Sequence, residues 1–203
     1  LFFAAGFQRQ IVSFLLWYGW VALFDRNNLI GNPGIPYVGW ILLCCAAIPN
    51  GEPFCIFTKR DAGWIFPKQL FYGAWAIMAI GYTLSGIDKL NSPSWRDGSA
   101  IVHLLNNPLA RDWDLRHFFL SMPQLVLNGM TWGILLLEII FLPLTLVDKT
   151  RKYIWLLTVL MHLGILLIVD FADLTFGMLM IHALTFDPSW FKVTRKLFPT
   201  IST

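Results

Sequence analysis

The sequence predicts an all-α fold, a polytopic transmembrane helical bundle of about six membrane helices with one long exoplasmic loop. Of the 203 residues, 57% are hydrophobic and 13% are charged, whereas soluble domains carry roughly 25% charged residues. So few charges leave too little polar surface to coat a water-soluble globule, and lipid can face the excess apolar surface. We expect residues 1–203 to form a single transmembrane domain, because this length allows one compact domain.

The first two apolar runs cover about residues 11–24 and 35–48. A turn, Asn32-Pro33-Gly34-Ile35-Pro36, separates them, and Pro36 suits the first turn of a new helix. A helix needs about 20 apolar residues to cross the hydrocarbon core, with a range of about 17–25. The second run is short, so we expect it to be tilted, extended by its flanks or not fully spanning.

The third run covers about residues 67–87 and ends at Asp88-Lys89. Residues 88–122 then form the predicted exoplasmic or lumenal loop, which contains one amphipathic piece at 99–105. The fourth run covers about residues 123–147 and contains Pro143, which should kink its helix.

The last apolar stretch, residues 153–185, is too long for one membrane helix, because it would measure about 50 Å at 1.5 Å per residue. We expect it to break at Asp170–Asp173, the only polar place within it. The fifth helix would end near residue 169 and the sixth would begin near residue 173. Residues 148–152 are predicted to be a tight charged turn, and residues 187–203 a basic cytoplasmic tail.

The basic residues predict the orientation. If all six helices span, ten of the 15 Lys and Arg residues fall on one side, which is predicted to be cytoplasmic. Loop 88–122 then faces the outside or the lumen. The expected surroundings are the lipid bilayer and, in addition, other membrane subunits or a secreted peptide. A small net charge of +3 does not suggest nucleic acid. The ten residues on the richer side are Arg9, Lys59, Arg60, Lys68, Lys149, Arg151, Lys152, Lys192, Arg195 and Lys196.

Ionisable residues within or beside the apolar runs are the candidates for chemistry, because charge in a bilayer is rare and usually faces protein or a cavity. Lys89 comes first: partial burial disfavours the charged ammonium, and a neutral amine can act as a base. Alternatively, Lys89 reaches the headgroups or pairs with a carboxylate. Its neighbour Asp88 does not decide this, since adjacent residues in a helix point apart.

Two further candidates lie deeper. Glu138 must be protonated or paired, and serves either as a proton relay or ligand contact, or as a hydrogen bond between helices. His162 could polarise or deprotonate a substrate, or simply bond to a neighbouring helix. No metal site is predicted: Cys44 and Cys45 are adjacent, match no zinc spacing, and are interpreted with Cys55 as structural.

Two segments resemble a known family. Tyr82–Leu90, followed by Ser94–Gly98, is similar to the G-x-x-K-L … W-x-x-G segment of the HTTM family, which contains the membrane part of vitamin K-dependent gamma-carboxylase. Bacterial relatives include sporulation-delaying protein B-type proteins, which help to mature a secreted toxin peptide. Further similar pieces are Arg26–Ile30 with Asn32-Pro33, Leu137-Glu138, Pro143, Met161-His162-Leu163 and Phe186–Trp190.

The resemblance implies a function. In the carboxylase, the lysine of this segment is the base linked to oxygenation of a reduced quinone, after which a peptide glutamate loses a proton and carbon dioxide adds. Lys89 matches that lysine, so Lys89 and His162 are the catalytic candidates, and Glu138 and Asp88 the candidates for contacting the quinone cofactor. The carboxylase also has a large lumenal domain that grips its substrate propeptide, and we expect none within these 203 residues.

These observations leave two main hypotheses. A carboxylase-like or quinone-epoxidase-like enzyme, modifying a peptide at the outer face, should have an apolar cavity between helices with Lys89 at its wall. A non-catalytic subunit or scaffold of a larger membrane complex should instead have Lys89 and Glu138 internally paired, and no cavity. A peptide-toxin maturation factor is a further alternative. Transport ranks last, because only Glu138 and His162 could line a polar path.

Overall fold

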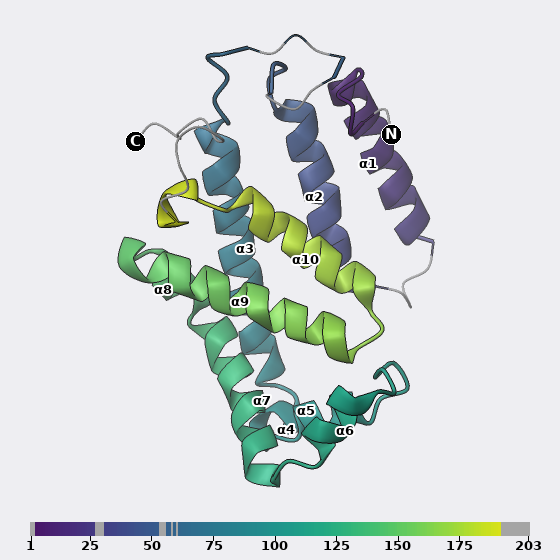
Figure 1. The fold of residues 1–203 in the computed structure, drawn as a ribbon, viewed down its shortest axis with the longest axis vertical. Helices are drawn as coiled ribbons and strands as arrows, with labels where there is room; N and C mark the ends of the chain where they lie inside the picture. Colours follow the sequence, from purple (N-terminus) through teal and green to yellow (C-terminus); the bar gives the residue numbers. More distant parts are fainter. Residues whose placement is uncertain (1–2, 27–30, 53–55, 58, 60, 192–203) are drawn as a thin grey trace. The chain divides into compact units, whose positions relative to one another are not determined.

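The computed structural model describes residues 3–26, 31–52, 56–57, 59 and 61–191, and in this part of the chain the secondary structure is helical apart from one isolated β-bridge. The chain forms two compact units, Leu1–Ala74 with Phe176–Thr203 (unit 1) and Trp75–Thr175 (unit 2). The helices shown in Figure 1 are α1 (Arg9–Phe24), α2 (Gly34–Ala47), α3 (Lys68–Lys89), α4 (Pro93–Arg96), α5 (Ala100–Leu105), α6 (Asp114–Leu120), α7 (Gln124–Ile139), α8 (Phe141–Thr145), α9 (Asp148–Ile168) and α10 (Ala172–Leu184).

Two helices of the described chain, α3 with 22 residues and α9 with 21, are long and apolar enough to cross a membrane. A third span results if α6 and α7, which meet at 105°, count as one broken span. The helices α1, α2 and α10 are apolar but measure only about 20–24 Å at 1.5 Å per residue, less than a hydrocarbon core of about 30 Å. The all-α prediction is therefore confirmed, while six spanning helices are not.

In unit 1, α1 and α2 pack side by side in opposite directions (Figure 1). Hydrogen bonds from α1 reach α2 in reverse order along the chain: Trp20 Nε1 donates to the Ile35 carbonyl at 3.0 Å, and Ser13 Oγ to the Leu42 carbonyl. Arg9, which the sequence places on the side richer in Lys and Arg, is buried in the first turn of α1. It donates to the Ile48 carbonyl at 2.6 Å and pairs with Glu52 at 3.2 Å, so its charge is satisfied at the C-terminal end of α2.

A second contact within unit 1 depends on two glycines. A Cβ added to Gly177 of α10 would lie 2.5 Å from the carbonyl oxygen of Gly34, at the start of α2. A residue with a side chain would not fit at such a distance, so glycine allows the two backbones to touch. This is the usual way in which membrane helices associate closely.

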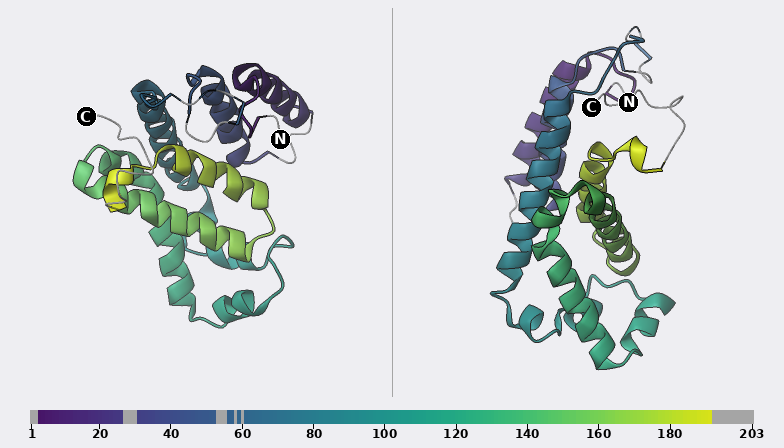
Figure 2. Two further views of the ribbon diagram at one scale, coloured as in Figure 1. Left: turned by 45° about the horizontal axis from the view of Figure 1, so that its top comes forward. Right: turned by 90° about the vertical axis from the view of Figure 1, so that its left-hand side faces the viewer.

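Unit 2 contains α4–α9 and the C-terminal part of α3. Both views of Figure 2 show α4, α5 and α6 gathered around the N-terminal end of α7. An apolar cluster of Ile101, Leu105 and Leu127 joins α5 to α7, and the Ile101 N–H donates to Thr131 Oγ1 at 3.2 Å. The predicted amphipathic piece at 99–105 corresponds to α5. The short helices α4 and α6 were not predicted.

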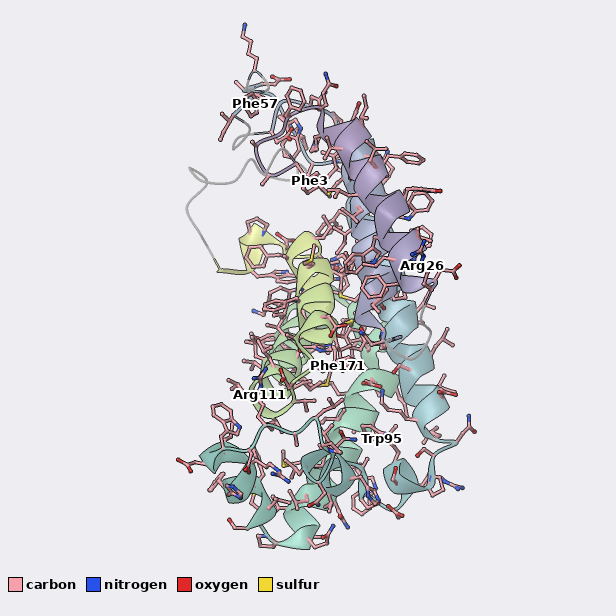
Figure 3. The ribbon with its side chains drawn as sticks, turned by 90° about the vertical axis from the view of Figure 1, so that its right-hand side faces the viewer. Phe3, Arg26, Phe57, Trp95, Arg111 and Phe171 are labelled. Carbon is pink, nitrogen blue, oxygen red and sulfur yellow. The ribbon has the colours of Figure 1, made fainter. Side chains whose placement is uncertain are left out.

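Both predicted breaks are present. Proline clashes with the carbonyl four residues earlier, and α7 ends at Ile139, four residues before Pro143. The long apolar stretch breaks between α9 and α10, where the antiparallel bridge joins Ala110 to Val169. Figure 3 shows Arg111 and Phe171 on the two segments that this bridge connects.

Two other sequence predictions have different outcomes. The predicted charged turn at 148–152 is instead the first helical turn of α9, where Asp148 complements the positive end of the helix dipole. The basic tail falls mostly outside the described residues, which include only its first part, with a 3₁₀ turn at Pro188–Phe191.

Candidate functional site

One face of α3 carries the candidate site. Tyr82, Ser85, Gly86 and Lys89 follow one another at spacings of three or four residues, which places them on the same side of a helix. Each of the four contacts α7, α8, α9 or another residue of this face, all within unit 2. The segment singled out in the sequence therefore forms a packing surface that ends in a charged group.

Lys89 and Glu138 form an ion pair. The Lys89 Nζ lies 2.5 Å from Glu138 Oε2 and donates to Ser85 Oγ at 2.7 Å. The Lys89 side chain is 23% exposed and that of Glu138 only 8%. The Trp95 ring also faces the ammonium, 5.2 Å from its centroid, which is within range of a cation–π interaction. Both charges are thus satisfied by protein groups, as a low-dielectric setting requires.

Gly86 makes this pairing possible. A Cβ at this position would lie 2.8 Å from the Ile139 backbone nitrogen and 3.0 Å from Glu138 Cβ. Glycine therefore allows α3 and α7 to approach within backbone contact just where Glu138 reaches across. One helical turn further along α3, Lys89 meets its carboxylate.

His162 meets α3 through Tyr82. Its Nε2 shares a hydrogen bond of 2.7 Å with the Tyr82 hydroxyl, and both residues are buried. The Tyr82 ring stacks on Phe141, which is fully buried, with the ring centroids 4.5 Å apart. The structure therefore places His162 in a buried contact with Tyr82, on the same face of α3 that ends in Lys89.

Asp88, the other predicted cofactor contact, is exposed and does not share the face of Lys89. The structure thus brings Lys89 and Glu138 together, attaches His162 to the same helix through Tyr82, and leaves Asp88 apart. The sequence analysis did not single out Tyr82, Thr83, Ser85 or Trp95 as site residues. For Tyr82 and Ser85 the available signal was their spacing from Lys89, since residues three, four or seven positions away share its helix face. Thr83 and Trp95 are each six positions from Lys89 and gave no such signal.

The connection between α3 and α7 has its own ordered turn, which explains the W-x-x-G pattern. Gly98 has φ +87°, and a Cβ there would lie 2.9 Å from Asn128 Cβ. Trp132 Nε1 donates to the Arg96 carbonyl at 3.2 Å. Asp97 accepts a hydrogen bond from the Ser99 N–H at 2.8 Å, and hydrogen bonds from the Ser99 side chain and backbone lower the pKa of Asp97 below its usual 3.8.

The described residues contain no group of three or more His, Cys, Asp or Glu that could hold a metal ion. Two hollows stand out in the same part of the chain, both in unit 1. One, of about 410 Å³, lies between α1 and α2, and the other is lined by residues near Arg9. Neither is lined by Lys89 or Glu138.

No known family model, curated protein or solved structure matches this chain. The geometry of the Lys89–Glu138 pair therefore carries the functional argument.

Proposed function

We propose that this chain is an integral membrane protein that uses the Lys89–Glu138 pair as a proton-transfer site, in the quinone-linked modification of a peptide at the outer face. The observation that supports this most strongly is the 2.5 Å contact between Lys89 Nζ and Glu138 Oε2. Ionisable groups inside a membrane protein are costly to bury and mark functional sites by default.

The pair can act as a base because a proton can move between its two members. Moving one proton from Nζ to the carboxylate converts the ion pair into a neutral amine and a neutral acid, with no change in net charge. The neutral amine of Lys89 can then accept a proton from a substrate hydroxyl at Nζ. Ser85 and Trp95 orient the amine. The ammonium that forms is balanced by the oxyanion left on the substrate, while Glu138 keeps the proton that it received.

The donor set fits the polar end of a reduced quinone, because an amine beside a carboxylate can both donate to and accept from a hydroxyl. When bound, a reduced quinone would supply the acidic hydroxyl and the two electrons that oxygenation by dioxygen consumes. Lys89 and Ser85 are the residues that would hold this end of the molecule. Asp88 is exposed and does not belong to this donor set.

A non-catalytic role is the second candidate, and two observations favour it. Lys89 is already paired internally, and neither described hollow is lined by it. In this role the pair would hold α3 against α7 in a subunit or scaffold of a larger membrane complex. A buried ion pair is weak evidence for stability, so this alternative must be tested by activity rather than by folding.

The test uses the full chain in lipid nanodiscs with a menaquinol as the probe. Oxygen consumption and oxidation of the quinol are followed in the wild type, in Lys89→Met and in Lys89→Ala. The proposal predicts turnover above protein-free nanodiscs in the wild type and its loss in both variants, because neither side chain can accept a proton.

The control is Lys149→Met, which removes an exposed amine of α9 away from the pair and should leave turnover unchanged. Turnover that persists in both Lys89 variants would rule out Lys89 as the base. If the wild type itself shows no turnover, the scaffold candidate is favoured.

A further inference from the structure

Thr83 occupies the break between α7 and α8. In a regular α-helix, the Leu142 N–H would donate to the carbonyl of Glu138, four residues earlier. Here the Leu142 N–H donates to Thr83 Oγ1 at 3.1 Å, and this oxygen lies 3.3 Å from the Glu138 carbonyl oxygen. The Thr83 hydroxyl is thus inserted into the hydrogen-bond ladder of another helix, which is a recognised cause of a helix break.

The next bond of the ladder is missing for a covalent reason. Pro143 has no N–H, so the carbonyl of Ile139 receives no donor from four residues later. The Thr83 hydroxyl lies 3.4 Å from that carbonyl oxygen as well. Regular bonding resumes with the Leu144 N–H, which donates to the Ile140 carbonyl at 3.1 Å. One hydroxyl therefore serves three backbone groups, sharing its hydrogen between two carbonyls.

This arrangement bears directly on Glu138, because its own carbonyl is one of those groups. Glu138 lies in the last turn of α7, and its side chain leaves the helix next to the break. Gly86, one turn after Thr83, provides the backbone contact beside it. The direction of the carboxylate is thus determined by how α7 ends, and the end of α7 is held by Thr83.

We propose that Thr83 is a positioning residue: its hydroxyl fixes the last turn of α7 so that the Glu138 carboxylate meets Lys89. The proposal deepens the proposed function and rests on it for its biological meaning. A merely structural role would be to satisfy polar backbone groups where no water is available. The two roles predict different reactivity of the Lys89 amine in a variant whose backbone groups are satisfied without Thr83.

The experiment measures how fast a small amine-reactive reagent modifies Lys89, read by mass spectrometry of the full chain in nanodiscs. Exposed Lys149 is the internal reference. Thr83→Val, which keeps the shape but loses the hydroxyl, should raise the Lys89 rate about tenfold, a coupling of ordinary size between neighbouring groups. Thr83→Ser should restore the wild-type rate.

The matched control is Thr158→Val. It also removes a fully buried threonine hydroxyl, one that bonds to the carbonyls of Ile154 and Trp155 in its own helix. The Lys89 rate should not change in this variant. An increase as large as that in Thr83→Val would show that any buried hydroxyl has this effect, and would overturn the proposal.

Thr83→Val leaves polar backbone groups unsatisfied and risks misfolding. A second variant therefore separates the positioning role from the merely structural one. Thr83→Val with Pro143→Ala restores an N–H at position 143, so the α7–α8 ladder can close without Thr83. The proposal predicts recovered thermal stability but a Lys89 rate still about tenfold above wild type. Protection of Lys89 in this double variant would overturn it. The readout needs no quinone turnover, so its failure is distinct from that of the proposed function.

Discussion

Lys89 and Glu138 are 49 residues apart in the sequence, yet their side chains meet at 2.5 Å where α3 and α7 touch. The contact joins the end of one apolar helix to the end of another. Ser85 and Trp95 complete the surroundings of the amine. The following predictions test this pair and the elements that hold it.

Removing one partner of the pair should destabilise the protein strongly. Lys89→Met leaves the Glu138 carboxylate buried without its cation, and Glu138→Leu does the reverse, so each should cost about 3–5 kcal/mol of unfolding free energy. The double variant replaces the pair with apolar side chains and should recover most of that loss. Reversible unfolding in mixed micelles measures the cycle, and additive losses would mean that the two residues do not interact.

Gly86→Ala should separate α3 from α7. The added methyl group would meet backbone and Cβ atoms within 3.0 Å, and overpacking of this kind costs about 1–3 kcal/mol. Gly133→Ala is the control, because Gly133 is in α7 with nothing within 4 Å of an added Cβ. Thermal denaturation compares the two, and equal melting temperatures would contradict the close approach.

The turn at Asp97 should respond to acid. Its pKa is lowered by the hydrogen bonds from Ser99, so the stabilisation is fully present above pH 3.8 and is lost as the pH falls through the lower folded-state value. Ser99→Ala removes the side-chain contribution and should move the Asp97 pKa back toward 3.8. NMR titration of the Asp97 carboxyl carbon measures this, and an unchanged value would exclude the Ser99 hydroxyl as the cause.

The orientation can be tested with single cysteines in a background where Cys44, Cys45 and Cys55 are replaced by serine. Asn107 is in the long connection and Lys149 at the start of α9, and both are exposed. A membrane-impermeant maleimide on intact cells should label Asn107→Cys, because the side richer in Lys and Arg stays cytoplasmic. Lys149→Cys should be labelled only after permeabilisation. The opposite pattern would invert the predicted orientation.

The sequence predicted the helical class and the two breaks, because apolar runs, Pro143 and the polar Asp170–Asp173 stretch act locally. The six spanning helices that it predicted are not confirmed, because α1, α2 and α10 are only 13–16 residues long, which apolar composition does not reveal. The helix α6 was not predicted, because its seven residues are too few to show a clear helical repeat of apolar side chains.

The candidate site was predicted in its members but not in its geometry. Charge cost alone indicated that Lys89 and Glu138 each needed a partner, and pairing was one of the open alternatives for both. That each is the partner of the other depends on Gly86 and on the insertion of Thr83 into α7, which are contacts distant in sequence. Pattern reasoning has no access to such contacts from a single chain.

The central claim is that Lys89 and Glu138 act as one proton-sharing unit within the membrane protein. Solid-state NMR in lipid bilayers tests it directly, with ¹⁵N at Lys89 Nζ and ¹³C at the Glu138 carboxyl. The account predicts strong dipolar coupling between these two nuclei, and its loss in Thr83→Val. Absence of that coupling in the wild type, with Lys89 as reactive toward amine reagents as Lys149, would contradict it.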